Sequence, residues 1–538
     1  MRRLSVPQIA LVVAALTLGS KFIGFAREII KANYYGTSYV VDSLSISENI
    51  PGMIFAGVLA ATATSFMPLF SEKIEKEGEV AANKYTSQII NLLVIICIVA
   101  SFIGIFLSKQ IVTLFTMPEV AAPAGTNVLE QIGWFVTHGW TGERAALSYL
   151  YVNVTFSYML FSSVCGILES YIRYKGVFVR QVLAGYTFSA CIIIAIVASR
   201  IVEDPRLIVY GSLAGNIVRL ILIALVSKRE KYKYTPEFRF TDTVKHIFTL
   251  AMPIFIGSSV SQISFFVDDM LASGLDTGNV ASISYSSLIV NTIVAITATV
   301  ISTIIYPKMA QAIAQEDNDR FGDLFTRGLV ITLIIGVPVS MASFLYNSQI
   351  IQIIYERGAF SEASTGLTSD AFMALAPATV FFMIAGYMIY AFYSQKQTKT
   401  PMTIAVIAIA VNILFDLLLV GRLGNIGLAL ATSISQAVNA MLLLLAFRKS
   451  NRVLAGRSLL YKLIKVLLAS LISVGGTAPI YFGVMALAAK NLWVMPRMAL
   501  LGATALVAIA VYVLVLMALK VHELHYFREM VGALKSKG

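Results

Sequence analysis

The chain has 538 residues, of which 58% are hydrophobic and 13% are charged, and its mean hydropathy is +0.80. A soluble domain carries about 25% charged residues, so this composition excludes a water-soluble protein. The net charge of +12 comes from basic residues dispersed between apolar stretches, which argues against binding of nucleic acid. The three cysteines lie within apolar stretches and predict neither a disulfide framework nor a metal site.

Apolar stretches of about 20 residues recur along the whole chain, and each can cross a hydrocarbon core of ~30 Å. We predict an all-α polytopic membrane protein with about fourteen transmembrane helices. The expected spans are residues 6–33, 40–70, 86–116, 145–172, 180–200, 206–227, 246–274, 280–306, 322–347, 366–393, 401–421, 424–447, 460–489 and 495–520. The first span resembles a signal peptide, but its helical pattern continues to Ile29, so we expect it to remain uncleaved.

Basic residues predict the orientation of these spans. Lys and Arg concentrate in one alternating set of connections, around residues 173–180, 228–245 and 448–457, and in the C-terminal tail. Positive charge marks the cytoplasmic side, so we expect both termini to be cytoplasmic. Three tryptophans lie in the opposite loops, where an interfacial aromatic belt is expected; they are Trp134, Trp140 and Trp493.

Pairs of similar span ends predict an internal repeat. The second and eighth spans end at Pro68 and Pro307, and the fourth and tenth lead into Tyr171 and Tyr390. Each pair is six spans apart and exits on the same side, as in a parallel repeat of two bundles. The predicted domains are an N-lobe of six spans over residues 1–228, a C-lobe of six spans over 229–450, and a C-terminal helix pair with a tail over 451–538.

Charged residues inside spans are functional candidates, because a charge at membrane depth costs a few kcal/mol even on insertion scales. One group lies on and around the first span: Lys21, Arg27, Glu28, Lys31, Asp42 and Glu48. Cations on one helical face suit an anionic substrate such as a phosphate. The alternatives are an internal salt bridge, for example between Arg27 and Asp42, or snorkelling of Lys31 to the interface.

A second group is acidic and rich in oxygen. Asn412 and Asp416 lie one turn apart in the eleventh span, and Asp268 lies beside Asp269 in the seventh. Thr432 and the backbone of Leu428 are one turn apart in the twelfth span. Such oxygen donors suit a hard cation, with Na⁺ the expected ion. The alternative is a hydrogen-bonded cluster that only holds the helices together.

Motifs for catalysis are missing from the chain. No Gly-x-x-x-x-Gly-Lys-Ser/Thr phosphate loop occurs, and the histidines do not form a metalloprotease pair. We therefore expect a transporter and not an enzyme.

Several segments of the chain form a recognisable set of motifs, at residues 20–30 (SKFIGFAREII), 35–37 (YGT), 65–68 (SFMP), 267–275 (VDDMLASGL), 355–360 (YERGAF), 391–401 (AFYSQKQTKTP) and 427–433 (GLALATS). These segments resemble those of the MurJ (MviN) family, the lipid II flippases of the MOP exporter superfamily. They occur in the family order over about residues 5–450. The resemblance implies alternating access of two lobes that carry undecaprenyl-pyrophosphate-linked peptidoglycan precursor to the outer leaflet, for cell wall synthesis.

The resemblance also implies roles for individual residues. Arg27 and Glu28 match an arginine–acid pair that faces the cavity, Asp42 matches a further cavity acid, and Lys21 stands where a basic residue is frequent. A sodium site described in some members matches Asp268, Asn412, Asp416, the Leu428 carbonyl and Thr432. The last two spans resemble the pair that forms a groove for the isoprenoid tail.

The chain departs from the family pattern at three places. The segment Pro51-Gly-Met-Ile-Phe lacks the usual arginine, and Leu288 stands where an arginine is usual. Residues 119–144 lengthen an outward loop, either as a surface helix or as an insertion without function. The missing arginines leave open a flippase for another lipid-linked oligosaccharide, of O-antigen or capsule type.

Two further alternatives are a MATE-like cation-coupled exporter and a membrane scaffold that moves no substrate. The expected partners are lipid II and membrane lipids, and we expect a monomer because the paired halves already enclose a site.

Overall fold

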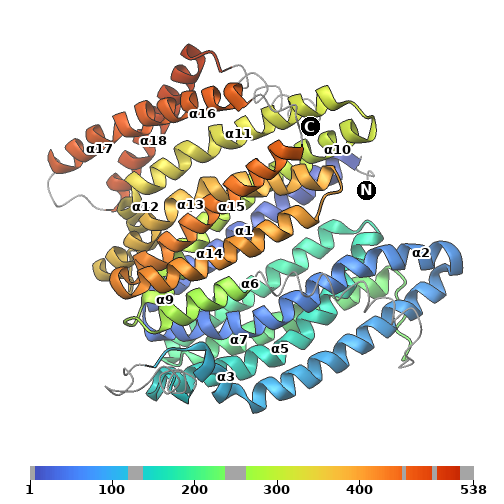
Figure 1. Cartoon of the computed structure of the whole chain (residues 1–538). Helices are drawn as coiled ribbons and strands as arrows, with labels where there is room; N and C mark the ends of the chain where they lie inside the picture. The colour runs from blue at the N-terminus through green and yellow to red at the C-terminus, as the bar shows by residue number, and fades with distance from the viewer. Residues whose placement is uncertain (1–5, 119–136, 237–261, 451–455, 488–493, 522–538) are drawn as a thin grey trace. The chain divides into compact units, whose positions relative to one another are not determined.

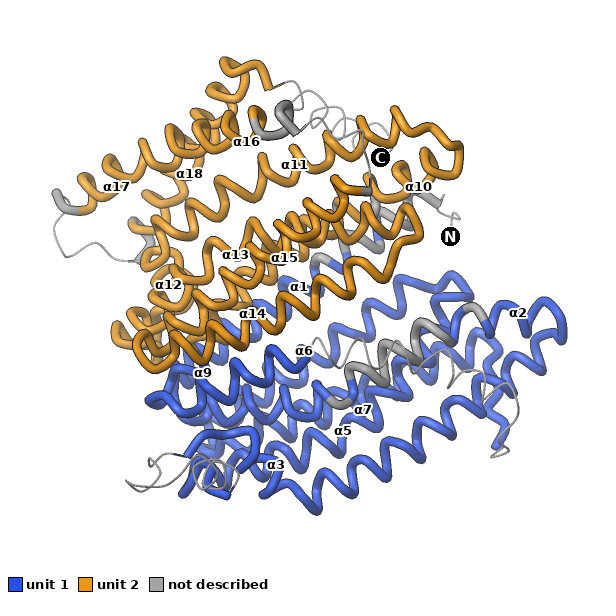
Figure 2. Tube along the Cα trace, viewed as in Figure 1, with its two compact units in different colours: residues 1–281 blue, residues 282–538 orange. Residues whose placement is uncertain are grey.

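The computed structural model describes residues 6–118, 137–236, 262–450, 456–487 and 494–521. Helices account for nearly all of these ranges, and no strand occurs within them (Figure 1). The chain divides into two compact units, residues 1–281 and 282–538 (Figure 2). The predicted lobes, with their first boundary at residue 228, remain a prediction.

Each unit is built from a succession of helices. The first unit contains α1 (Val6–Tyr35), α2 (Tyr39–Phe106), α3 (Ser108–Phe115), α5 (Gly142–Tyr174), α6 (Phe178–Val202), α7 (Arg206–Arg229) and the first turn of α9 (Asn279–Val300). The second contains the rest of α9, the π-helical turn η1 (Ile301–Ile305), α10 (Tyr306–Ala314), α11 (Asn318–Leu345), α12 (Asn347–Tyr355), α13 (Glu362–Ser394), α14 (Lys399–Leu423), α15 (Asn425–Ser450), α16 (Gly456–Ser470), the π-helical turn η2 (Leu471–Gly475), α17 (Gly476–Leu487) and α18 (Val494–Ala518).

Eleven helices in the described ranges are long and apolar enough to cross a membrane. They correspond to all predicted spans except 6–33, 40–70 and 246–274. The first two of these are helical, as α1 and the first part of α2, and most of the third lies outside the described residues. The polytopic helical class is therefore confirmed, whereas the number fourteen remains a prediction.

The helix α2 joins two predicted spans in one run of 68 residues. Its backbone departs from helical geometry at Gly78, where φ is 84° and ψ is −180°. Glycine adopts positive φ without the steric cost of a Cβ, so the chain turns here between the two spans. The charged stretch before Gly78, which we expected to be a connection, is helical and carries the ion pairs Lys73–Glu77 and Lys76–Glu72.

Aromatic side chains fill the core of each unit. In the first unit, Phe66 stacks on Phe70 and on Tyr85, with ring centroids 5.3 and 5.7 Å apart. In the second, Phe325 stacks on Phe447 at 4.4 Å. Such interlocking side chains stabilise helix contacts in a bilayer, where lipid is as apolar as the protein and packing replaces the hydrophobic effect.

The chain that leaves α7 lies along the second part of α2, and we call residues 230–236 the strap. On α2, the polar residues Asn83, Ser87 and Asn91 are spaced by four and share one helical face. Their strap bonds are Asn83 Nδ2 to Lys231 O at 3.2 Å, Ser87 Oγ with Tyr232 OH at 3.0 Å, Thr235 N to Ser87 Oγ at 3.1 Å, and Tyr234 OH to Asn91 Oδ1 at 2.6 Å. Burial raises the pKa of Tyr232 to about 12, so its hydroxyl keeps its proton at neutral pH.

Candidate functional site

Three charged side chains gather on α1 within about one helical turn. Arg27 Nε donates to Glu28 Oε1 at 3.0 Å, and a second guanidinium nitrogen lies 2.8 Å from the same oxygen. Lys31 forms an ion pair with the other oxygen of Glu28. The side chains of Arg27, Glu28 and Lys31 are 24%, 14% and 9% exposed. One carboxylate therefore serves two cations, and the most accessible of the three groups is the guanidinium of Arg27.

Further groups surround this α1 cluster. Glu48 on α2 interacts electrostatically with both Lys31 and Arg27. The Arg27 guanidinium lies 5.9 Å from the centre of the Phe188 ring on α6. A guanidinium has five N–H donors, and those not directed at Glu28 remain to bind an anion. Lys21, predicted to share this face, is exposed two turns earlier on α1.

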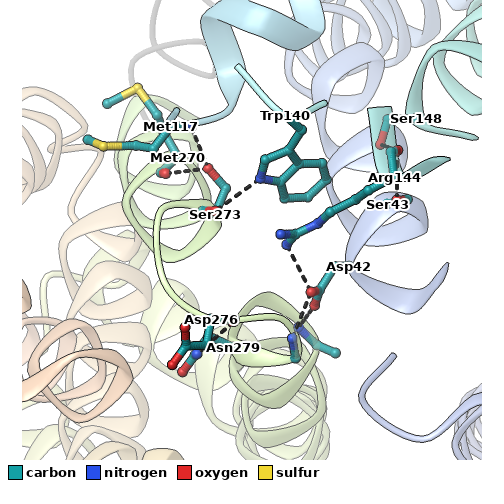
Figure 3. A network of polar contacts seen from close by, with 12 residues as sticks. Asp42, Ser43, Met117, Trp140, Arg144, Ser148, Met270, Ser273, Asp276 and Asn279 are labelled. Carbon is teal, nitrogen blue, oxygen red and sulfur yellow. Dashed lines mark hydrogen bonds and ion pairs between the residues drawn. The ribbon is translucent and has the colours of Figure 1, made fainter. Parts of the chain in front are cut away.

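Asp42 belongs to a different network at the start of α2 (Figure 3). Its carboxylate is 0% exposed and forms an ion pair with Arg144 of α5 at 2.9 Å. It also accepts hydrogen bonds from the backbone N–H groups of Gly278 and Ala281, each at 2.8 Å. The internal salt bridge that we considered between Arg27 and Asp42 is wrong: Arg27 pairs with Glu28, and Asp42 pairs with Arg144. Arg144 was not among the predicted site residues, and it lies 102 residues from its partner in the sequence.

Trp140 lies within the same network and not at a membrane interface. It is 2% exposed, its indole N–H donates to the Ser273 carbonyl at 3.0 Å, and the Arg144 guanidinium carbon lies 3.4 Å from the ring centroid. The belt prediction is therefore wrong for Trp140, because the cation and the carbonyl satisfy the indole inside the protein. Trp134 and Trp493 lie outside the described residues.

Two further polar pairs connect helices of the first unit. Asn49 Nδ2 donates to the carboxylate of Asp269 at 2.7 Å. Arg219 of α7 binds Glu169 of α5 with nitrogens at 2.5 and 3.0 Å from one oxygen. The Glu169–Arg219 pair was not predicted, although the intramembrane position of both charges is a signal for it.

Four members of the predicted sodium group lie in the second unit. Asp416 is 0% exposed and accepts a 2.7 Å hydrogen bond from Asn412 Nδ2, one turn earlier on α14. On α15, the Thr432 hydroxyl donates to the Leu428 carbonyl at 3.2 Å. The helices α14 and α15 pack against each other. The fifth member, Asp268, lies in the first unit.

The donor chemistry of this group fits a hard cation, because it combines a buried carboxylate with amide, hydroxyl and carbonyl oxygens on two helices that pack against each other. Within the residues that the structure describes, no group of three or more His, Cys, Asp or Glu forms a metal site. A sodium site here would therefore depend on neutral oxygens around Asp416, and its occupation remains a prediction.

These features define a multi-pass helical membrane protein with charged groups buried among its spans, which is the pattern of a transporter. The sequence matches the family described as lipid II flippase MurJ over residues 31–501. Because the match spans most of the 538 residues, the chain belongs to the lipid II flippase MurJ family. The resemblance predicted from the motifs is thereby confirmed.

Individual relatives agree with this assignment. A protein of Rhizobium tropici described as a probable lipid II flippase MurJ is 24% identical over 516 residues, which cover 94% of this chain and 92% of that protein. A solved structure of lipid II flippase MurJ in an inward closed conformation has a TM-score of 0.76 and 23% identity, covering 97% of this chain and 100% of that one. An inward-facing multidrug resistance MATE family transporter of the MOP superfamily has a TM-score of 0.63 and 14% identity, covering 82% and 98%. At these identities the solved structures show a shared fold.

Proposed function

We propose that this chain carries lipid II, the undecaprenyl-pyrophosphate-linked peptidoglycan precursor, from the inner to the outer leaflet of a bacterial cytoplasmic membrane by alternating access. The observation that carries the proposal is the family match over residues 31–501. The family match favours lipid II over another lipid-linked oligosaccharide and over a cation-coupled drug exporter.

The α1 cluster supplies the chemistry for a pyrophosphate. Arg27 is its most exposed member and offers N–H donors in a planar fork that matches phosphate oxygens. In the structure, Glu28 and Glu48 balance the charges of Arg27 and Lys31. An incoming pyrophosphate competes with these carboxylates, so its binding rearranges the salt bridges that hold α1. Lys21 supports the same anion from the exposed part of the helix, in place of the arginines missing near Pro51 and at Leu288.

The ion that drives transport is a second part of the proposal. The four members of the predicted sodium group in the second unit, Asn412, Asp416, the Leu428 carbonyl and Thr432, hold Na⁺, which would supply a fixed positive charge. Binding can bias two conformations only through a difference in affinity between them. Replacing Asp416 with Ala should remove any dependence of flipping on Na⁺, measured as initial rates in Na⁺ and in choline buffers. An unchanged Na⁺ response would return this group to a packing role.

Location and assembly follow from the same function. A flippase of this precursor works in the inner membrane, and the basic connections support a cytoplasmic position for both termini. A monomer suffices, since each half contributes its own bundle.

The test is complementation in bacteria whose own lipid II flippase can be shut off. Growth and outer-leaflet exposure of the precursor are measured together, with membrane insertion of the chain checked by immunoblot. Restored exposure and growth support lipid II as substrate and make the missing arginines dispensable. The opposite outcome is a stable, inserted chain that restores neither growth nor exposure, while a relative restores both in the same host. That result would contradict lipid II as the substrate and favour another lipid-linked glycan.

A further inference from the structure

The network around Asp42 ties the first turn of α9 to α2 and α5. Gly278 and Ala281 present two of the N–H groups that a helix leaves without intrahelical partners at its N-terminus. Gly278 N–H donates to one oxygen of the Asp42 carboxylate and Ala281 N–H donates to the other, at 2.8 Å each. The carboxylate is thus an N-terminal cap supplied by another helix, and its negative charge opposes the positive end of the α9 dipole.

A fully buried carboxylate stays charged only if its partner is held in place. Arg144 supplies the countercharge at 2.9 Å, and the Trp140 ring covers its guanidinium at 3.4 Å. Trp140 is itself fixed at both ends, because its indole N–H binds Ser273 O and its backbone N–H binds Thr116 Oγ1 at 3.2 Å. Trp140 therefore holds Arg144, Arg144 holds Asp42, and Asp42 caps the N-terminus of α9.

Close backbone contacts hold this network together at three glycines. A Cβ on Gly278, whose φ is +99°, would lie 2.6 Å from the Thr37 carbonyl oxygen. A Cβ on Gly139 would lie 2.7 Å from Thr113 Cα, and one on Gly274 would lie 2.8 Å from Met117 Cβ. The segments that carry the network therefore approach one another closely at these glycines, which leave no room for a side chain.

The position of α9 in the chain gives this cap its importance. Ala281 is the last residue of the first unit, and α9 continues from it into the second. The contacts that hold the first turn of α9 therefore also hold the segment of the chain where the first unit ends.

We propose that Arg144, backed by Trp140, is the positioning residue that keeps Asp42 on the N-terminus of α9, and that this clasp must release α9 during each transport cycle. The clasp consists of Asp42, Trp140, Arg144, Gly278 and Ala281. Asp42 then acts through α9 and does not grip substrate, unlike the role that the resemblance implied. The transport part rests on the proposed function, whereas the cap itself does not.

The test measures exposure of the first turn of α9 directly. In the full-length chain with Cys97, Cys165 and Cys191 replaced by alanine, Val280→Cys places a thiol where the native side chain is 1% exposed. The rate of its reaction with a maleimide is followed in purified protein, and folding is checked by thermal unfolding. We expect Arg144→Gln to speed labelling at least about tenfold, because the pair partner of a buried charge is lost. Arg206→Gln, at a side chain 66% exposed, is the control and should leave the rate unchanged.

A double-mutant cycle separates positioning from general loosening. Asp42→Asn with Arg144→Gln should label no faster than either single variant, since paired residues are strongly non-additive. An unchanged labelling rate in folded Arg144→Gln, or effects that simply add in the double variant, would overturn the proposal.

If Arg144→Gln does not fold, substitutions of Trp140 provide a second test. Trp140→Phe keeps an aromatic face for Arg144, whereas Trp140→Leu removes it, so the leucine variant should label faster. Equal rates would overturn the supporting role of the ring. Labelling requires no lipid II, so failure of the clasp and failure of the transport proposal give different results. In cells, Arg144→Gln should lower precursor exposure, and Arg144→Lys should restore part of it by returning the charge.

Discussion

Two ionic groups of the first unit differ in how completely they are satisfied. In the clasp, the carboxylate of Asp42 is 0% exposed and accepts from Arg144, Gly278 and Ala281. In the α1 cluster, Arg27 is 24% exposed and forms its hydrogen bond and its ion pair with one neighbouring carboxylate, that of Glu28. The clasp therefore resists change, whereas the α1 cluster can exchange a protein partner for a ligand. Charge alone does not mark a binding site; accessible donors beside a replaceable counterion do.

The comparison is tested most strongly at Arg27. Arg27→Ala should reduce outer-leaflet exposure of the precursor by at least about 100-fold, since a charge-assisted phosphate contact is lost. The variant should remain folded, because Glu28 keeps Lys31 as a partner. Flux and thermal unfolding are measured on the same preparation. Normal flux in Arg27→Ala would remove the α1 cluster from the substrate site.

Asp42→Asn should act mainly on stability, unlike Arg27→Ala. Removing one partner of a buried pair costs about 3–5 kcal/mol, because Arg144 is left charged and buried. Unfolding in mixed detergent micelles measures this loss. A variant that is as stable as the parent but inactive would instead return Asp42 to direct substrate contact.

Gly278→Ala tests the backbone part of the clasp without changing any charge. The added methyl group meets the Thr37 carbonyl, and the positive φ is strained for alanine, so we expect a loss of about 1–3 kcal/mol. Gly502→Ala is the matched control, since no atom lies within 4 Å of its Cβ position. Equal stability of the two variants would show that α9 can shift away from Thr37.

Glu28→Gln should have the smallest effect on stability. Its side chain is 14% exposed, and Glu48 still interacts with Lys31 and Arg27, so we expect a loss of about 1–2 kcal/mol. The same micelle unfolding assay measures it. A loss larger than that of Asp42→Asn would reverse the comparison between the two groups.

Most of the span pattern was predictable, because bilayer thickness imposes a one-dimensional signal on each helix. The Arg27–Glu28 pair was also predictable, since its members are adjacent in the sequence. Lys31 follows one turn later and joins them, as helical spacing requires.

The clasp could not be predicted in the same way. Asp42 and Arg144 are 102 residues apart, and nothing in the spacing of either shows that α2 and α5 pack together. The internal salt bridge considered for Asp42 therefore had the wrong partner, Arg27 in place of Arg144. The prediction for Trp140 was wrong for the same reason. Its position in a loop suggested the membrane interface, but the Arg144 guanidinium lies over its ring and the side chain is buried.

The strap has a consequence for biosynthesis. Asn83, Ser87 and Asn91 enter the membrane as part of α2, but their strap partners come 143–148 residues later in the chain. At ~5–20 residues per second, translation reaches those partners about 7–30 s afterwards. During that interval the polar stripe cannot face lipid without a cost, so α2 must wait beside the translocon or in contact with water. The stripe has all its strap partners only after residue 235 has emerged, so this part of the first unit is assembled after α7 has been made.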